Sequence, residues 1–461
     1  MAASFLDRFL AANPLPPGID AEVIRREWLA LRPPLHPRER LLPAPVWARR
    51  PFDDSGRQAW QILRRDVPAI DPARPYCVYV HVPFCAQRCA FCDCYSFRLG
   101  AHRERHVDGY VDLLAAELGA WGRLGCLARR PLTTVHLGGG TPTFLGPKHL
   151  ERLVGLCREH LAPGPEAEWA LESTAADLSP EMLACLDGLG FARLHVGVQT
   201  LDDGLRRALG RRLPAAEVLA AIERAIALGW VVSVDLLCGL PGQTLAGLAG
   251  DVVALAAAGV DGFSLYELQL SKRNRPFAER HGLPGRDRAE TYLVYVAASQ
   301  FLVSLGYLKT AYNHFARPRD TNLYFTFPER GEDLLALGTI ADGRFGDYHY
   351  RHPTYAPYRR AVVEDFPGLQ GGLRRSAAEN RLEPLETALM LGRVPRSLLH
   401  DVAGPGLAGL WQELLFLAPG PGDDELILSD SGSWFVGNMI SQVLDPQAAA
   451  EGETHGAGEC P

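Results

Sequence analysis

The chain reads Tyr79-Val80-His81-Val82-Pro83-Phe84-Cys85-Ala86-Gln87-Arg88-Cys89-Ala90-Phe91-Cys92-Asp93-Cys94 over residues 79–94, and four of its ten cysteines lie in this stretch. Cys85, Cys89 and Cys92 follow an apolar, strand-like run at the spacing C-x3-C-x2-C. A loop with this spacing can turn three thiolates onto three irons of one four-iron four-sulfur cluster. The fourth iron would then have no protein ligand and could bind a small molecule.

Two other metal sites are compatible with these cysteines, although both match the spacing less well. A structural zinc ion normally has four protein ligands, usually as two separated pairs, and Cys94 or His81 could complete such a set. A cluster that only transfers electrons needs four cysteines, and Cys94, two positions after Cys92, has poor reach to the same cluster. The role of Cys94 stays open.

The composition is that of a folded protein without a strong charge. The 461 residues are 47% apolar and 22% charged, which is enough for a core in two or three structural units. A net charge of −7 does not attract DNA or anionic lipid. No apolar run reaches the roughly 18 residues of a membrane-spanning helix, and residues 1–12 lack a basic segment followed by an apolar one. We expect a cytoplasmic protein that binds neither nucleic acid nor membranes.

From residue 76 onward, strand-like and helix-like segments alternate. This alternation predicts parallel strands joined by right-handed crossovers. Six strands are too few for a closed eight-stranded barrel, so the expected fold is α/β, a partial (β/α)6 barrel. The predicted strands are Tyr76–Val82, Thr133–Leu137, Trp169–Ser173, Leu194–Val198, Val231–Leu237 and Phe263–Leu268. The predicted helices lie near residues 107–122, 147–161, 179–189, 214–228 and 244–258.

Each predicted strand delivers a polar or glycine-rich segment to the same end. In barrels of parallel strands, the active site is built at the carboxyl ends of the strands. One carboxylate in an apolar strand can be a structural hydrogen-bond partner, but several at corresponding positions are hard to explain by packing. In chain order the strand ends carry the cysteines, Gly138–Pro142, Glu172, Gln199, Asp235 with Gly239–Gln243, and Tyr266 with Glu267.

The chain divides into four predicted parts. Residues 1–75 are rich in proline and arginine and predict an extended arm, and the barrel occupies residues 76–305. The alternation stops near residue 305, so we expect residues 306–445 to form an additional α+β domain that caps the barrel mouth and ends in a winged-helix-like unit. Residues 446–461 are rich in Ala, Gly and Glu and are expected to be disordered.

Taken together, these motifs resemble the radical S-adenosylmethionine (SAM) superfamily, and within it the subfamily of the oxygen-independent coproporphyrinogen III oxidases. The resemblance covers about residues 76–350 and is weaker toward the end of the chain. It implies a partial barrel that uses a [4Fe-4S] cluster and SAM. Besides the cysteine spacing, it rests on Tyr79–Phe84, Gly138–Thr143, Gly197–Asp202, Gly239–Thr244 and His314–Pro318.

The resemblance also implies roles for the matching residues. Cys85, Cys89 and Cys92 would hold the cluster, whose open iron binds the amino and carboxylate groups of SAM. One electron would then cleave SAM to a 5′-deoxyadenosyl radical. Tyr79 and Phe91 match residues beside the cluster, and several relatives bind a second SAM molecule near the residue that matches Arg211. The implied SAM contacts are Gly139, Gly140, Thr141, Glu172, Gln199, Arg211 and Asp235.

Three branches of the subfamily differ in activity. An oxidase branch decarboxylates a tetrapyrrole, a chaperone branch binds heme, and class C methyltransferases use two SAM molecules to methylate or cyclopropanate an sp2 carbon. The His-Asn-x-x-Tyr-Trp tract that marks the heme chaperones is replaced here by Thr321-Asn322-Leu323-Tyr324-Phe325. Residues 338–351, rich in glycine and aromatic side chains, resemble the methyltransferases more than the chaperones.

Methyl transfer to an sp2 carbon needs a group that takes a proton from that carbon before the product forms. Tyr266 and Glu267 are the candidates, and the alternative is structural: a hydroxyl bonded to a neighbouring strand and a carboxylate in a salt bridge. The sequence predicts a class C radical SAM methyltransferase (HemN-like subfamily) acting on a small-molecule or peptide-borne heteroaromatic natural-product intermediate. It would depend on an electron donor of the flavodoxin or ferredoxin type. The alternatives are an oxygen-independent coproporphyrinogen III oxidase and a heme chaperone.

Overall fold

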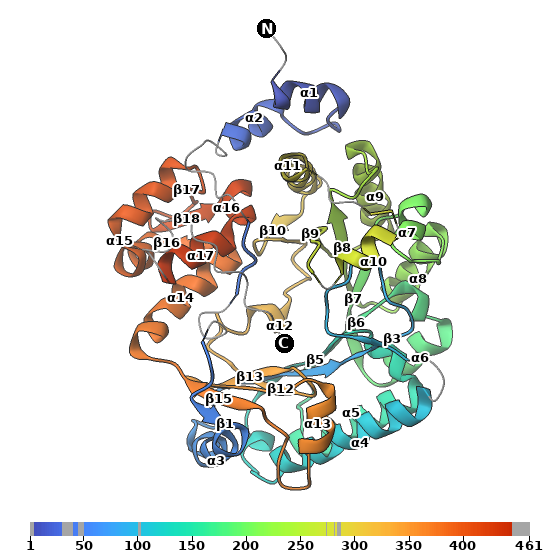
Figure 1. The fold of residues 1–461 in the computed structure, drawn as a ribbon, viewed down its shortest axis with the longest axis vertical. Coiled ribbons are helices and arrows are strands. Elements are labelled where there is room, and N and C mark those ends of the chain that lie inside the picture. Colours follow the sequence, from blue (N-terminus) through green and yellow to red (C-terminus); the bar gives the residue numbers. More distant parts are fainter. Residues whose placement is uncertain are drawn as a thin grey trace.

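The computed structural model describes residues 4–29, 40–44, 50–99, 103–272, 274–280, 282–283 and 287–444. A 13-stranded mixed sheet forms the centre of the molecule, and it curves as an arc with helices on its outer side (Figure 1). The order of its strands is β1-β15-β14-β13-β12-β2-β5-β6-β7-β8-β9-β11-β10. In the part of the chain described here, no helix is long and apolar enough to cross a membrane.

Six neighbouring strands of this sheet are parallel and follow one another in chain order. They are β2 (Tyr76–Val82), β5 (Leu132–Gly139), β6 (Glu168–Ser173), β7 (Phe191–Gln199), β8 (Val231–Cys238) and β9 (Gly262–Glu267). The helices between them are α4 (Arg103–Gly122), α5 (Pro147–Leu161), α6 (Pro180–Gly188), α7 (Asp203–Ala208), α8 (Ala215–Ala227) and α9 (Leu245–Ala258). The predicted α/β partial barrel is confirmed.

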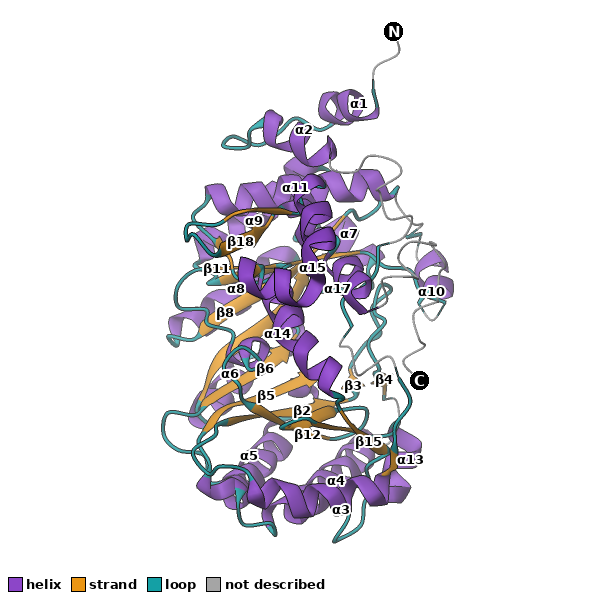
Figure 2. Ribbon diagram, turned by 90° about the vertical axis from the view of Figure 1, so that its left-hand side faces the viewer, coloured by secondary structure: helices purple, strands orange, loops and turns teal. Residues whose placement is uncertain are grey.

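Successive side chains of a strand point to opposite sides of the sheet, one facing the helices and the other facing the interior of the curve. In β8, Val232, Val234 and Leu236 are fully buried in the core that includes the helices, and Ser233 and Asp235 lie on the opposite side. Figure 2 shows the strands between α9 and α11 (Arg288–Ser304) at one end and α4 and α5 at the other. The polar strand residues noted above therefore lie inside the curve of the sheet.

The sheet extends past residue 305 at both edges of the parallel strands. β12 (Asp333–Leu337) pairs in parallel with β2, and β11 (His314–Ala316) pairs antiparallel with β9. The sheet thus crosses the boundary that the sequence places at residue 305, because these pairings satisfy the edge groups of β2 and β9. The remaining strands of the sheet are β10 (Leu308–Lys309), β13 (Asp342–Phe345), β14 (Tyr348–Arg351), β15 (Gly371–Arg374) and β1 (Asp54–Ser55). Two short helices accompany this part of the chain, α12 (Leu323–Thr326) and α13 (Tyr355–Ala361), and the short helix α10 (Arg275–Arg280) lies earlier, between β9 and α11.

The C-terminal part consists of helices around a small antiparallel sheet of order β16-β18-β17. Its elements are α14 (Ala377–Leu391), β16 (Arg393–Pro395), α15 (Arg396–Glu413), β17 (Leu417–Pro419), β18 (Glu425–Leu428), α16 (Asp430–Trp434) and α17 (Val436–Leu444). The tail predicted over residues 446–461 lies outside the described residues.

The N-terminal arm contains three helices, α1 (Phe5–Ala12), α2 (Ala21–Leu29) and α3 (Gly56–Asp66), where the sequence predicts an extended segment. The segment 40–44 lies against α17, where Leu41 N donates to Asn438 Oδ1 at 3.0 Å. A Cβ at Gly437 would be 2.2 Å from Leu41 O, so glycine is required for this close approach. The arm therefore reaches the C-terminal helices.

Candidate active site

The cysteine loop begins where β2 ends. β3 (Phe84–Cys85) pairs in parallel with β4 (Phe97–Arg98) and closes the base of the loop. Ala90 N of the loop donates to the carbonyl oxygen of Leu209, which follows α7, at 3.0 Å, and Cys92 N donates to Cys89 O within the loop at 3.3 Å. These bonds hold the three predicted cluster ligands in one turn at the carboxyl end of β2.

The three thiols are half-buried, and none of them forms a disulfide. Burial raises the pKa of the Cys85 thiol, and the Cys92 and Cys89 sulfurs raise it further, although the Thr141 hydroxyl donates to Cys85 Sγ at 3.5 Å. Sulfurs influence one another in this way only at short range. Among the described residues, no three His, Cys, Asp or Glu side chains converge on a point where one ion would fit. Thiolates that bind separate irons of a cluster need not converge in this way.

Cys94, which the sequence analysis leaves without a role, is hydrogen-bonded to Cys92. This bond is the main reason why the pKa of Cys92 falls to about 6, and it raises the pKa of Cys94. The Cys94 thiol is thus the donor. A lowered pKa favours the thiolate, which is the form that binds a metal. Cys94 stabilises negative charge on its neighbour.

The glycine-rich tract after β5 lies against the base of the cysteine loop. Gly140 N donates to Val82 O at 2.7 Å and Thr141 N donates to Phe84 O at 2.8 Å, which ties the two segments together. A Cβ at Gly140 would lie 2.7 Å from the Phe84 carbonyl oxygen, so the backbones can approach only at a glycine. Gly139, at a φ of +107°, directs its N–H to Glu172 Oε2 at 3.1 Å.

We expect Gly140→Ala to displace this tract without unfolding the barrel. The added methyl group meets backbone atoms, and relief of such overpacking costs about 1–3 kcal/mol. If the tract contacts SAM, affinity for SAM should fall by about tenfold, as measured by equilibrium dialysis on reconstituted protein. Gly155→Ala on α5, where a Cβ meets nothing within 4 Å, is the matched control. Equal affinity in the two variants would contradict the expected contact.

Glu172, on the interior side of β6, stands beside three aromatic rings. Burial opposes its ionisation, but His136, at 3.2 Å from Glu172 Oε1, and the Gly139 N–H outweigh burial and lower the pKa of Glu172. The His136 ring is stacked on Tyr324 with 4.5 Å between centroids, and Tyr324 is stacked on Tyr79 at 5.1 Å. Two of the predicted site residues, Glu172 and Tyr79, thus share one wall of the barrel interior.

Asp235 and Ser233 of β8 hold His195 of β7. His195 Nε2 lies 2.5 Å from Asp235 Oδ1, and His195 Nδ1 lies 2.8 Å from Ser233 Oγ. Burial disfavours charge on the ring, but attraction by Asp235, Glu172 and Asp320 outweighs burial and raises the pKa of His195 to about 9. At neutral pH the barrel interior therefore contains an imidazolium among carboxylates.

The raised pKa of His195 makes a part of the folding stability depend on pH. The ordinary value is 6.5 and the folded value is about 9, so this stabilisation is complete below pH 6.5 and is lost as the pH rises through 9. We expect the difference in unfolding free energy between the wild type and His195→Gln to shrink across that window. Urea unfolding at pH 6 to 10 measures it, with the exposed His400→Gln as control. A pH-independent difference for His195→Gln would rule out the shifted pKa.

Gln199, Arg211 and Phe91 come together beside the cysteine loop. Gln199 ends β7 at a φ of +71°, a left-handed conformation that is rare outside glycine and often marks functional sites. A Cβ on Gly197 would lie 2.9 Å from Gln199 Nε2 and 3.2 Å from Arg211 Nη2, so both side chains cover this glycine. Arg211 donates to the Gly197 carbonyl, and its guanidinium lies 5.6 Å from the centre of the Phe91 ring.

Tyr266 and Glu267 point to opposite sides of β9. In the register with β8, Tyr266 lies beside Leu237 and Glu267 lies beside Cys238, which is fully buried on the helix-facing side. Tyr266 therefore faces the barrel interior with 43% of its surface exposed, and its hydroxyl is hydrogen-bonded to the Asn313 side chain. The structure brings Tyr266, and not Glu267, to the same side as Asp235.

Glu267 takes part in an ion pair instead. Arg40 of the N-terminal arm and the Gln269 amide both donate to Glu267 Oε1, and both members of the ion pair are largely buried. Arg40 also donates to the Trp434 carbonyl at 2.7 Å and lies 4.2 Å from the centre of its ring. This is the salt-bridge arrangement that the sequence analysis considers as the alternative for Glu267.

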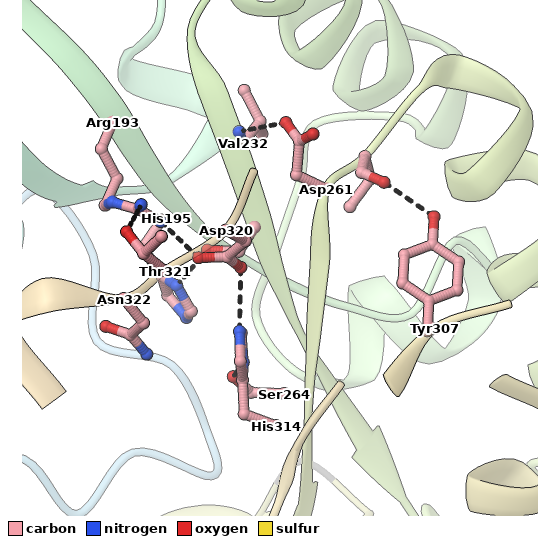
Figure 3. Close-up of polar contacts among 12 residues, drawn as sticks. Arg193, His195, Val232, Asp261, Ser264, Tyr307, His314, Asp320, Thr321 and Asn322 are labelled. Carbon is pink, nitrogen blue, oxygen red and sulfur yellow. Dashed lines mark hydrogen bonds and ion pairs between the residues drawn. The ribbon is translucent and has the colours of Figure 1, made fainter. Parts of the chain in front are cut away.

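Sequence reasoning missed a buried ion-pair network inside the barrel (Figure 3). Arg193 of β7 pairs with Glu168 at 2.9 Å and with Asp320, and Asp320 lies 2.9 Å from His314 Nε2. Burial opposes the charge on Asp320, but His314 and Arg193 lower its pKa to about 2. The network joins β6 and β7 to β11 and to the segment that leads to α12.

A sequence signal for this polar interior was present. Arg193 and His195 occupy alternate positions of an apolar strand, and that spacing directs both side chains to the same side of a sheet. Asp320 and Tyr324 had no such signal, since neither lies in a periodic segment.

The chain is similar in sequence to known proteins. Residues 79–251 match the sequence model of the radical SAM superfamily. The chain is 30% identical to the anaerobilin synthase of Escherichia coli O157:H7 over 301 residues. This match covers 64% of this chain and 65% of that protein. It is 29% identical to the oxygen-independent coproporphyrinogen III oxidase of Escherichia coli K12 over 342 residues. This match covers 70% of this chain and 72% of that protein.

The fold has a solved counterpart. The structure of coproporphyrinogen III oxidase (HemN) from Escherichia coli superposes with a TM-score of 0.73 at 24% identity, covering 85% of this chain and 95% of that one. Residues 79–251 match the radical SAM superfamily, and the chain is similar to proteins of the coproporphyrinogen-oxidase-like type. The resemblance drawn from the motifs is thereby confirmed, and so are the cofactors of this superfamily, a [4Fe-4S] cluster and SAM. The chain spans just under two thirds of the anaerobilin synthase.

Proposed function

We propose that this chain is a class C radical SAM methyltransferase that adds a SAM-derived one-carbon unit to an sp2 carbon of an uncharged heteroaromatic natural-product intermediate. Cys85, Cys89 and Cys92 would hold the cluster, because they lie on one loop at the carboxyl end of β2 and the sulfurs of Cys92 and Cys89 raise the pKa of Cys85. When bound, the reduced cluster supplies the electron that cleaves one SAM molecule, and a second SAM molecule supplies the methyl group. The thiols require a reducing compartment, which supports a cytoplasmic location.

The residues around the cysteine loop suit a bound SAM molecule. Gly139, Gly140 and Thr141 lie against the cysteine loop, because a Cβ at Gly140 would be 2.7 Å from the Phe84 carbonyl oxygen, and this tract would border a SAM molecule bound to the cluster. The side chains of Glu172 and Asp235 lie inside the curve of the sheet, where they can balance the SAM sulfonium and accept from ribose hydroxyls. Gln199 and Arg211 are positioned over Gly197, where the guanidinium can bind the carboxylate of SAM.

The proposed substrate class is inferred from the charges of the barrel interior. Arg193 is paired with Glu168 and Asp320, His195 with Asp235, and Arg351 with Asp342. A tetrapyrrole with several carboxylates needs cations that are not already neutralised. These interior cations are already paired with carboxylates. The rings of Tyr79, His136 and Tyr324 are stacked nearby. Such an interior suits a flat, uncharged substrate better than a polycarboxylate.

Tyr266 would handle the proton that leaves the methylated carbon. Its hydroxyl faces the interior, and its position deep within the barrel, where protein displaces bulk water from around it, together with the nearby Asp235 raises its pKa above the usual value. The phenol is therefore protonated at neutral pH and would act as a relay, accepting a proton on its oxygen while giving its own to a neighbouring acceptor. Glu267, the other predicted proton carrier, would support this end of β9 through its pair with Arg40.

Labelled SAM tests the proposal. The reconstituted protein is incubated anaerobically with dithionite and SAM that carries a trideuterated methyl group, with and without azole, indole and porphyrinogen candidates. Deuterium in 5′-deoxyadenosine together with S-adenosylhomocysteine supports methyl transfer through two SAM molecules. Unlabelled deoxyadenosine with carbon dioxide from coproporphyrinogen would assign the chain to the oxidase branch. Tight heme binding without S-adenosylhomocysteine release would assign it to the chaperone branch.

A further inference from the structure

A hollow of about 370 Å³ lies on the outer surface between α4 and α13, away from the barrel interior. It has no part in the proposed reaction, and its lining combines cationic side chains with one tyrosine. The lining residues are Arg105, His106, Gly109, Leu113, Tyr355 and Arg359.

The lining of this hollow contains Arg105, His106 and Arg359 and no acidic residue, and two nearby carboxylates of α4 are paired away from it. Asp108 binds His149 at 2.7 Å and Asp112 binds Arg152 at 2.7 Å, both on α5. Arg105 and Arg359 are exposed. The side of α4 toward α13 thus presents Arg105 and His106 to the hollow, while Asp108 and Asp112 are engaged on the side toward α5.

The floor of the hollow is in direct contact with the cysteine loop. The Tyr355 ring lies 5.7 Å from the Phe84 ring and 5.8 Å from the Phe97 ring, measured between centroids. Tyr355 N also donates to the Tyr95 hydroxyl at 2.8 Å. Phe84 immediately precedes Cys85. The Tyr355 ring therefore lies between the hollow and Phe84, the residue next to a proposed cluster ligand.

We propose that this hollow is the docking site of an acidic electron-donor protein of the flavodoxin or ferredoxin type. This inference rests on the proposed function, since a radical SAM enzyme needs a reductant. The reduced donor loses one electron, and the cluster held by Cys85, Cys89 and Cys92 gains it. An acidic face around the donor's own cofactor would pair with Arg105 and Arg359, which brings that cofactor to the Tyr355 side of the loop.

Charge reversal at the hollow tests the docking site. Arg105→Glu combined with Arg359→Glu is compared with Arg64→Glu combined with Arg224→Glu, which makes the same change of charge at exposed sites on α3 and α8. Affinity for flavodoxin is measured by calorimetry at low and high salt, and SAM cleavage is driven either by reduced flavodoxin or by dithionite. Arg105→Gln with Arg359→Gln provides a milder variant in case the reversal impairs folding.

The expected result is a roughly tenfold loss of flavodoxin affinity and of flavodoxin-driven cleavage in the hollow variant alone, with a weaker salt dependence than the wild type. Dithionite-driven cleavage should be the same in all variants, because dithionite needs no docking face. Equal flavodoxin affinity in the hollow variant and the control would overturn the docking site. Absence of dithionite-driven cleavage in the wild type would instead count against the proposed function, and the affinity measurement would still decide the docking site.

Discussion

Cys89→Ala is expected to reduce iron content and reductive cleavage of SAM to background while the barrel stays folded. If Cys85, Cys89 and Cys92 hold the cluster as proposed, the two thiolates that remain are too few to bind it, and the cluster is required for all later chemistry of the proposed reaction. The barrel should survive because the loop is anchored by backbone bonds, such as that from Ala90 N to Leu209 O, which the substitution leaves intact. Iron analysis, the visible spectrum of the reconstituted protein and deoxyadenosine assay measure the loss, and circular dichroism checks the fold.

Two cysteine variants make this result specific. Cys185→Ala on α6 removes a half-buried thiol outside the cysteine loop and should change neither iron content nor cleavage. Cys94→Ala should keep the cluster, because Cys94 acts through its hydrogen bond to Cys92. Full cluster-dependent cleavage in Cys89→Ala, or loss of iron in Cys94→Ala, would mean that the ligand set is assigned incorrectly.

Tyr266→Phe should uncouple SAM cleavage from product formation. The variant keeps the ring and loses only the hydroxyl that faces the barrel interior, so deoxyadenosine should still form. The methylated product should fall by roughly 10²–10⁴, the usual contribution of a positioned proton-transfer group. Mass spectrometry of deoxyadenosine and product in the same reaction gives the ratio, with the substrate that the labelled-SAM experiment identifies.

Glu267→Gln is the matched comparison, since it removes a charge from the neighbouring residue on the opposite side of β9. The amide keeps an oxygen that can accept from Arg40, so the product should fall by much less than in Tyr266→Phe. A larger loss in Glu267→Gln would return the proton-transfer role to this carboxylate. Equal turnover of Tyr266→Phe and wild type would remove the phenol from the mechanism.

Much of the barrel could be read from the chain because its signals are local. Apolar runs such as Val231–Leu237, bounded by turn residues, mark strands whatever lies around them, and β8 is observed at Val231–Cys238. The position of strand ends follows from the same signals, so Glu172, Gln199 and Asp235 could be assigned to one end of the sheet. The spacing of Cys85, Cys89 and Cys92 is equally local, because one turn must bring all three together.

Long-range pairing was beyond the reach of such signals. β12 pairs with β2, although more than half of the chain separates the two strands in sequence. The sequence of Asp333–Leu337 does not indicate which strand it pairs with. The same holds for Arg40, which meets Glu267 only because the N-terminal arm crosses to the C-terminal helices. An ion pair between residues so far apart depends on the folded path of the whole chain.

The sequence predicts which residues lie at the strand ends, but it does not predict on which side of a strand each of them lies. Composition and periodicity establish the parallel barrel, its cysteine loop and the list of polar residues at its strand ends, since each depends on neighbours in sequence. Only the register between β8 and β9 separates Tyr266 from Glu267, because a shift by one residue would exchange their sides. Register is set by contacts between strands, so the tertiary structure alone assigns Tyr266 to the interior and Glu267 to its partner Arg40.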